Sequence, residues 1–204
     1  MKRYFFALFA CIGLVLSASN APAQAEAVIG KTAPDFKALD TYNNPISLDM
    51  LNGKIVVLEW TNNGCPYVRK HYDDGHMQKL QKDLAGEDLV WISVISSAPG
   101  KQGYMDAKTA NATALSEKAQ PTHIILDPTG EMGKAYGAKT TPHMYVIDKD
   151  GKLAYQGAID SHPTFRTRGM EDAQNYVVSA VKELRAGQPV TTSETQPYGC
   201  SVKY

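Results

Sequence analysis

The sequence predicts an α/β fold, a three-layer sandwich built around a central mixed β-sheet. Two continuous apolar runs, residues 55–58 and 89–95, are typical of strands buried on both faces, and a helical stretch lies between them. Further along the chain, an Asp150-Gly151 turn between two apolar segments indicates a β-hairpin. Alternating strands and helices, followed by a hairpin and a closing helix, favour helices packed in layers against one sheet.

The N-terminal half is predicted to open with a short hairpin over residues 34–51, around the turn Asn43-Asn44-Pro45. After the first buried strand, a helical pattern runs from Cys65 to about Leu84. Asp73-Asp74-Gly75 interrupts this pattern, so we expect a break there. The second buried strand is followed by a predicted helix over 106–118, a strand over 122–126 and a turn over 127–130.

The C-terminal half contains the hairpin, whose predicted arms are residues 143–147 and 153–157. The last helix is expected to run from about Glu171 to Arg185, because acidic residues open it and a glycine and a proline follow it. The remaining tail, residues 188–204, is polar, and we expect it to be irregular.

The N-terminus has the pattern of a secretory signal peptide. Lys2 and Arg3 precede an apolar run and small-residue cleavage sites, and we favour cleavage after Ala25. Cys11 would leave with residues 1–25, and the rest divides into one domain, residues 26–187, and a tail, 188–204. We therefore expect a periplasmic or secreted protein, whose Cys65 and Cys200 meet conditions that permit oxidation.

The charge balance excludes some partners. The chain has 21 basic and 21 acidic residues, and loss of Lys2 and Arg3 leaves 19 against 21, or a net charge of about −2. Without basic clusters, neither nucleic acid nor an anionic membrane surface is an expected partner. The apolar run of the leader is shorter than the roughly 20 residues of a spanning helix, so we expect no stable membrane insertion after cleavage.

Cys65 is the candidate reactive group. It stands where a β-branched strand gives way to a helix, so its sulfur is expected at the positive end of the helix dipole. That position lowers the pKa of a thiol and makes a thiolate available near neutral pH. Pro66 suits the first helical turn, where a missing N–H costs nothing. The alternative is a buried structural cysteine.

Four segments together resemble the redoxin branch of the thioredoxin superfamily, of the alkyl hydroperoxide reductase/thiol-specific antioxidant type. They are Gly64-Cys65-Pro66-Tyr67-Val68 with Lys70-His71-Tyr72, residues 96–104, residues 136–143 and Pro197-Tyr198-Gly199-Cys200-Ser201-Val202-Lys203-Tyr204. The resemblance covers nearly all of the exported chain. It implies a thioredoxin-like sandwich and a thiol-dependent oxidoreductase, for which we expect neither a cofactor nor a metal.

The resemblance also assigns roles to particular residues. Thr141-Pro142 aligns with the cis-proline bond beside the active thiol, where backbone groups meet a substrate chain; the alternative is an ordinary trans proline. Val68 replaces the second cysteine of the thioredoxin motif, and Asn62 stands where peroxiredoxins carry threonine. Cys200 could therefore resolve oxidised Cys65 by forming a Cys65–Cys200 disulfide, or it could be a tail cysteine that docks structurally or stays free.

Other residues complete the candidate site. Glu59 could accept the thiol proton if it is buried, or it could reach solvent or pair with Lys54 or Arg69. Arg69, or Lys70, could stabilise the thiolate, although these positions could equally form a solvated helix face. His71, Asp73, Asp74 and His76 lack the regular spacing of metal ligands. The expected substrate-binding residues are Thr141, Pro142, Asn62, Asn63, Pro66 and Trp60.

Three functions follow from these residues. In a peroxidase, the Cys65 thiolate would attack a hydroperoxide and become a sulfenic acid, which an external thiol reductant restores. In an exchange enzyme, the same thiolate would attack a disulfide substrate. A redoxin fold without catalysis could instead bind partners at the cis-proline edge and the 96–104 loop.

Overall fold

The computed structural model describes residues 27–204, so the predicted signal peptide, with Cys11, lies outside the described residues. A five-stranded sheet forms the centre of the fold, in the order β5-β4-β3-β7-β8. Its strands are β3 (Ile55–Trp60), β4 (Leu89–Ile95), β5 (His123–Leu126), β7 (His143–Ile147) and β8 (Leu153–Gly157). β3, β4 and β5 run parallel, whereas β7 is antiparallel to both β3 and β8. The predicted mixed sheet is therefore confirmed.

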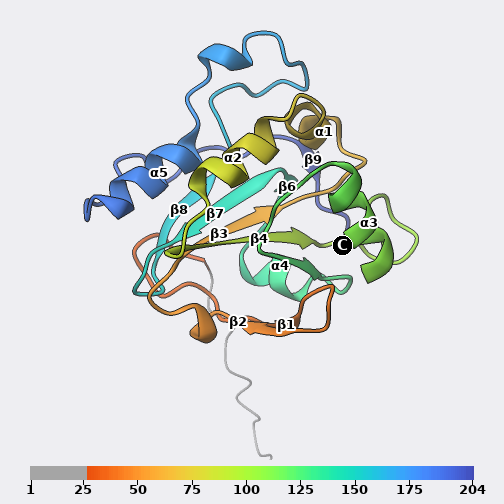
Figure 1. Cartoon of the computed structure of the whole chain (residues 1–204), viewed down its shortest axis with the longest axis horizontal. Helices are drawn as coiled ribbons and strands as arrows, with labels where there is room; N and C mark the ends of the chain where they lie inside the picture. Colours follow the sequence, from red (N-terminus) through yellow and green to blue (C-terminus); the bar gives the residue numbers. More distant parts are fainter. Residues whose placement is uncertain (1–26) are drawn as a thin grey trace, which may run out of the picture.

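Helices and a hairpin cover the two faces of this sheet. Above the strands in Figure 1 lie α1 (Pro66–Asp73), α2 (His76–Leu84) and α5 (Tyr176–Arg185), and below them lie the hairpin β1 (Lys37–Leu39)–β2 (Pro45–Ser47) and α4 (Glu131–Ala135). Alternation along β3 sends Ile55 and Val57 into the core under the first set, and Val56 and Leu58 into the core under the second. The three-layer sandwich is confirmed.

The first three helices begin and end close to the predicted residues. The break between α1 and α2 lies at Asp74 and Gly75. α3 (Ala107–Ser116) starts where the Asp106 carboxylate accepts a hydrogen bond from the Thr109 N–H. α3 and α5 have ten residues each, and residues 27–204 contain no helix that is long and apolar enough to cross a membrane.

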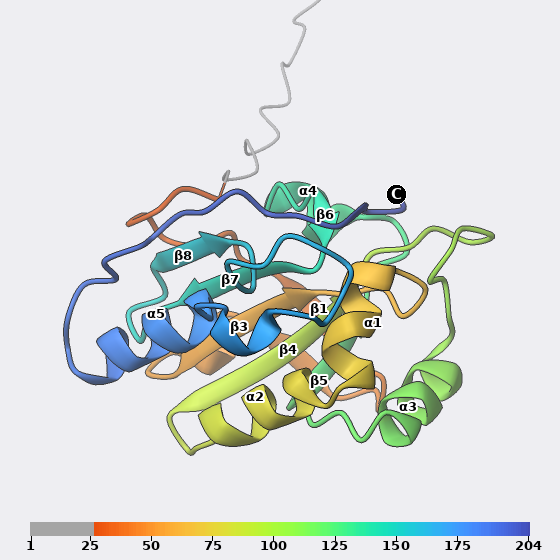
Figure 2. The same cartoon turned by 90° about the horizontal axis from the view of Figure 1, so that it is seen from above.

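Two local predictions were wrong, and one helix was missed. The last helix begins at Tyr176 rather than near Glu171, because the Asn175 side chain caps it by accepting the Val178 N–H. Residues 170–172 form a separate 3₁₀ helix, η2 (Met170–Asp172). The helix α4 had not been predicted. The tail is not wholly irregular: β9 (Cys200–Ser201) pairs with β6 (Thr140–Thr141). Figure 2 shows the tail passing beside β8 and β6 toward the C-terminus.

Candidate active site

Cys65 occupies the N-cap position of α1, with Pro66 in the first helical turn. Asn62 stabilises the turn before Cys65. The Asn62 side chain accepts a hydrogen bond from the Gly64 N–H at 2.9 Å and donates one to the Gln102 carbonyl at 3.1 Å. Gln102 in turn donates to the Gly64 carbonyl at 2.9 Å. Asn62 is thus buried and holds the reactive turn against the 99–104 loop.

Cys200 lies against Cys65 in the folded chain. The two Sγ atoms are 2.7 Å apart, although the cysteines are 135 positions apart in the sequence. The contact depends on the β6–β9 pairing, which sets Cys200 opposite Thr141. Cys65 is fully buried under the tail, and Cys200 is partly exposed. The fold therefore brings together the two cysteines of the described chain.

The Thr141-Pro142 bond is cis, as the resemblance implied. In its protonated form the Cys65 thiol donates a hydrogen bond to the Thr141 carbonyl at 3.1 Å, so the residue before the proline contacts the sulfur directly. Gly199 passes so close that a Cβ there would lie 2.0 Å from the same carbonyl oxygen, and its φ is +135°. Only glycine fits before Cys200 in this arrangement.

Electrostatics distinguish the two thiols. Burial raises the pKa of Cys65, but hydrogen bonds to its sulfur from Cys200, Thr141 and Val68 outweigh burial and leave that pKa below its ordinary value of 9.0. Burial, then the hydrogen bond to Cys65 and the charge on Cys65, raise the pKa of Cys200 to about 11. In the reduced pair, Cys65 therefore ionises first and Cys200 keeps its proton.

Glu59 is fully buried at the end of β3. Its carboxylate accepts hydrogen bonds from the Tyr72 hydroxyl at 2.8 Å, the Trp91 indole N–H at 2.9 Å and the Ser93 hydroxyl at 3.0 Å. Burial raises the pKa of Glu59, and these hydrogen bonds offset part of the rise. The carboxylate therefore neither reaches solvent nor pairs with Lys54 or Arg69, and within residues 27–204 it makes no hydrogen bond to Cys65.

Two predicted site residues are not brought to the sulfur. Arg69, one turn beyond Cys65, has its guanidinium in ion pairs with Asp73 and Glu117. Trp60 belongs to the core on the opposite face of the sheet, because the alternation of β3 turns it away from Glu59, and its indole N–H donates to Ser96 at 3.0 Å.

The remaining predicted residues differ in how close they lie to Cys65 and in how far they are buried. Pro66 adjoins Cys65, and Asn63 is exposed in the turn before it. His71 is buried, and burial lowers its pKa to about 3. The described part of the chain contains no group of three or more His, Cys, Asp or Glu side chains placed to hold a metal ion.

The sequence reasoning missed a polar cluster beside the cysteines. Lys70, buried on α1, donates to the His162 carbonyl at 2.7 Å and to the Tyr198 hydroxyl at 3.2 Å. The Tyr198 hydroxyl donates to the buried carboxylate of Asp160. The one available signal was the Pro-Tyr-Gly-Cys ending, which drew attention to Cys200 but assigned nothing to Tyr198.

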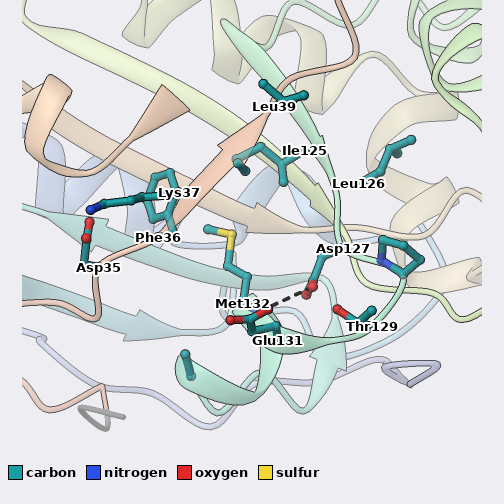
Figure 3. Close-up of a pocket in the computed structure, with 13 residues that line it drawn as sticks. Asp35, Phe36, Lys37, Leu39, Ile125, Leu126, Asp127, Thr129, Glu131 and Met132 are labelled. Carbon is teal, nitrogen blue, oxygen red and sulfur yellow. Dashed lines mark hydrogen bonds between the residues drawn. The ribbon is translucent and has the colours of Figure 1, made fainter. Parts of the chain in front are cut away.

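A separate hollow of about 650 Å³ lies between β1, the end of β5 and α4, where Phe36, Ile125 and Met132 line it (Figure 3). Asp127 borders it and accepts the backbone N–H groups of Met132 and Gly133 at the start of α4. None of the predicted site residues lines this hollow. Cys65 and Cys200 therefore lie apart from this hollow.

Comparison with known proteins agrees with the fold. The AhpC/TSA family matches residues 29–156. The thiol-disulfide oxidoreductase ResA of Bacillus thuringiensis subsp. konkukian is 27% identical over 125 residues, which are 61% of this chain. The chain spans 66% of the length of that relative, just under two thirds. Together, the family match and ResA support an oxidoreductase.

Solved structures share the architecture. An uncharacterized conserved protein from Geobacillus kaustophilus aligns with a TM-score of 0.73 at 23% identity, covering 87% of this chain and 92% of that one. The exposed lipoprotein thioredoxin Etrx1 of Streptococcus pneumoniae aligns with a TM-score of 0.53 at 26% identity, covering 74% of this chain and 99% of that one. The chain belongs to the AhpC/TSA family and is a redoxin of the thioredoxin superfamily.

Proposed function

We propose that this protein is a thiol–disulfide oxidoreductase whose redox pair is Cys65 and Cys200. The observation that carries the proposal is the 2.7 Å separation of the two sulfurs. A disulfide needs two sulfurs about 2.05 Å apart, so a small movement of the tail would allow the bond to form. The likeness to the thiol-disulfide oxidoreductase ResA supports the same reaction class.

The proposed reaction has two exchange steps. The Cys65 thiolate attacks one sulfur of a substrate disulfide, forms a mixed disulfide and releases the other substrate sulfur as a thiolate. Cys200 then loses its proton to solvent and attacks the Cys65 sulfur, which releases the second substrate thiolate. The substrate disulfide gains two electrons, the Cys65–Cys200 pair loses two, and an external thiol reductant returns the pair to its dithiol form.

The surrounding residues fit supporting roles in this reaction. The Thr141 backbone pairs with an extended chain opposite the sulfur, as its pairing with the tail illustrates. We infer that Thr141 and Pro142 bind the substrate chain, with Pro66 and Asn63 near the thiol and Asn62 holding the turn. Glu59, with its raised pKa, is proposed to take up the proton that Cys65 releases, through intervening groups rather than by direct contact.

A peroxidase is the second candidate, and the position of Cys200 also favours it. There the Cys65 thiolate would attack a hydroperoxide O–O bond, release an alcohol or water and become a sulfenic acid. The Cys200 thiol would displace water from that sulfenic acid and form the same disulfide. The AhpC/TSA match fits this chemistry. Asn62 counts against it, because it stands where peroxiredoxins carry threonine and its amide is engaged in hydrogen bonds with Gly64 and Gln102.

One experiment separates the two reactions. Fully reduced protein is mixed, in parallel, with a disulfide such as oxidised glutathione and with hydrogen peroxide, and the Cys65–Cys200 disulfide is followed by mass spectrometry. The proposal predicts rapid formation of the Cys65–Cys200 disulfide with oxidised glutathione. It also predicts that the protein reacts with hydrogen peroxide no faster than free cysteine does. A fast peroxide reaction alone would replace it with the peroxidase. No reaction with either oxidant would leave a non-catalytic binding module.

We propose the cellular location of the protein from its sequence. The leader over residues 1–25 would export the domain of residues 26–187 together with its tail, to the periplasm or the outside of the cell. The exposed lipoprotein thioredoxin Etrx1 offers a precedent for an exposed protein with this fold. The proposed partners are a disulfide or hydroperoxide substrate and an external thiol reductant, without nucleic acid.

A further inference from the structure

We propose that Tyr198 and Tyr204 are positioning residues that hold the tail on either side of Cys200 and thereby set the redox equilibrium of the Cys65–Cys200 pair. The inference rests on the proposed function, because it requires that the two cysteines form a reversible disulfide. It adds two residues on which that disulfide depends, neither of which touches the reacting sulfurs.

The first anchor lies two residues before Cys200. The Tyr198 ring packs against Tyr67 on α1, with ring centroids 6.0 Å apart, and the Lys70 ammonium lies 4.7 Å from its centroid. Its hydroxyl accepts a hydrogen bond from Lys70 and donates one to Asp160. Lys70 is 3% exposed and Asp160 is 5% exposed, so this hydroxyl satisfies two buried charged groups at once.

The second anchor lies four residues after Cys200. The Tyr204 ring lies against the start of α4, where there is room for it because Gly130 and Gly133 have no side chains. A Cβ on Gly130 would lie 2.2 Å from the ring, and one on Gly133 would lie 2.4 Å from the hydroxyl. That hydroxyl donates to the Ala138 carbonyl at 2.9 Å, and the Lys134 ammonium lies 5.5 Å from the ring centroid.

Backbone hydrogen bonds connect the second anchor to the cysteine. The Val202 N–H donates to the Lys139 carbonyl at 3.1 Å, and the Ala98 N–H donates to the Lys203 carbonyl at 2.8 Å. Together with the β6–β9 pair, these bonds fix the tail from Cys200 to the last residue. A tail that merely lay on the surface would need neither the two glycines nor the buried charges at the first anchor.

The anchors matter because Cys200 is remote in sequence. In a Cys-x-x-Cys motif the second thiol is held near the first by a few covalent bonds. Here the two thiols are 135 positions apart, so the effective concentration of Cys200 at Cys65 is set by how firmly the tail is docked. When an anchor is lost, disulfide formation must also order the tail, and the equilibrium shifts toward the dithiol.

The tail that these anchors hold covers the reactive sulfur. Cys65 has no exposed surface while the tail is in place. A loosened tail should therefore weaken the intramolecular disulfide and, at the same time, speed the reaction of Cys65 with an outside reagent. General destabilisation of the domain would not produce this pair of opposite changes at an unchanged melting temperature.

The test uses the full chain and measures the equilibrium constant for Cys65–Cys200 disulfide formation in mixtures of reduced and oxidised dithiothreitol. Thiols are trapped with a maleimide and counted by mass spectrometry. The variants are Tyr204→Ala, Tyr198→Phe and the double variant. Tyr204→Phe keeps the ring against the start of α4, and Tyr42→Ala, at a tyrosine that is 72% exposed, is the matched control.

We expect the double variant to lower the equilibrium constant about tenfold, equivalent to about 30 mV for this two-electron couple. Tyr204→Phe should recover most of the loss caused by Tyr204→Ala, and Tyr42→Ala should match the parent. In a Cys200→Ser background, Tyr204→Ala should raise the rate of Cys65 alkylation at least threefold. Tyr204 is 40% exposed and belongs to neither buried core cluster, so its truncation leaves the core intact.

Two results would overturn the inference. One is a double variant whose equilibrium constant stays within twofold of the parent value, and the other is a Tyr42→Ala variant that shifts as far as the double variant. If the parent forms no Cys65–Cys200 disulfide at any ratio of oxidised to reduced dithiothreitol, the proposed function fails as well. A parent that forms the disulfide but does not respond to the anchors contradicts only the positioning role.

Discussion

The Cys200 sulfur lies 2.7 Å from the Cys65 sulfur because the tail pairs with Thr141, the residue before the cis proline. The tail thus lies along the backbone edge that we propose for an extended substrate chain. Cys65 is buried beneath it, at the start of α1, with a lowered pKa. This redoxin lacks the local Cys-x-x-Cys pair, and its tail instead supplies Cys200 as the second thiol beside Cys65.

Replacing Cys200 with serine should uncouple the two steps of exchange. Cys65 retains its position at the helix start, so the first attack on oxidised glutathione persists. The mixed disulfide between Cys65 and glutathione then accumulates, because no thiol within the described chain can resolve it. Intact-mass spectrometry after a short reaction should find this adduct in Cys200→Ser and only the internal disulfide in the parent. Turnover with a thiol reductant should fall at least tenfold.

The matched control for that experiment is Cys65→Ser, which should form neither the adduct nor the internal disulfide. If Cys65→Ser instead carried glutathione on Cys200 as readily as Cys200→Ser carries it on Cys65, the assignment of Cys65 as the attacking thiol would be reversed.

The reaction of Cys65 with iodoacetamide should depend on pH with a midpoint below 9.0, the ordinary thiol value. The thiolate is the reactive form, so a lowered pKa keeps the rate high as the pH falls until the pH passes that pKa. Cys200→Ala removes a hydrogen bond to the sulfur and should move the midpoint upward. Peptide mapping of protein alkylated between pH 5 and 12 measures the midpoints in the parent and in Cys200→Ala. Cys200 itself should react with a midpoint near 11, and equal midpoints for the two thiols would contradict the account.

Glu59→Gln should change how stability depends on pH. The folded-state pKa of Glu59 is raised above its ordinary value of 4.5, so the proton binds more tightly to the folded than to the unfolded state. Its stabilising contribution is therefore full below pH 4.5 and is lost as the pH rises through the folded-state pKa. Glutamine keeps acceptors for Trp91 and Ser93 without the buried charge.

The expected outcome is a free energy of unfolding for Glu59→Gln that equals the parent's at pH 4 and exceeds it by about 1–3 kcal/mol at pH 8, the cost of ionising a buried carboxyl group. Urea unfolding at the two pH values measures the difference. If Glu59→Gln were less stable than the parent at pH 8, the protein would stabilise the ionised carboxylate of Glu59. That result would contradict a raised pKa for this group.

Gly199→Ala should dislodge the tail from the active site. An added methyl group would lie 2.0 Å from the Thr141 carbonyl oxygen, and a φ of +135° strains any residue with a side chain. We expect the internal disulfide to form at least tenfold more slowly after treatment with oxidised glutathione, with little change in melting temperature. Gly187→Ala is the matched control, since it also has a positive φ but nothing within 4 Å of its added Cβ. Equal slowing in both variants would argue against a specific clash at Thr141.

Much of the fold follows from local sequence. The two apolar runs predicted β3 and β4, the Asp-Gly turn predicted the β7–β8 hairpin, and Asp73-Asp74-Gly75 predicted the break between α1 and α2. These features depend on residues close together in the chain, so periodicity and turn chemistry are sufficient. The start of α5 was misjudged because acidic residues near 171 competed with Asn175, whose capping hydrogen bond decides the boundary.

The active site was predictable only in part. Cys65 and the cis proline carry local or family signals, and Glu59 could be suspected from its place in an apolar strand. The pairing of the tail with Thr141 could not be derived, because residues 140 and 201 meet only after the whole domain has folded. The same holds for Lys70, Asp160 and Tyr198, which come from three separate segments. Arg69 was attractive in sequence, but its guanidinium pairs with Asp73 one turn along α1 and with Glu117, whose position depends on where α3 ends.

The most direct test of the central claim is the redox state of Cys65 and Cys200 after reduced protein is treated with a small excess of oxidised glutathione. Free thiols are blocked with a maleimide and the protein is digested without reduction. The account predicts one peptide pair joined through Cys65 and Cys200, in a monomer that has lost two hydrogen atoms. Cys65 oxidised or glutathionylated beside a maleimide-blocked Cys200 would contradict it.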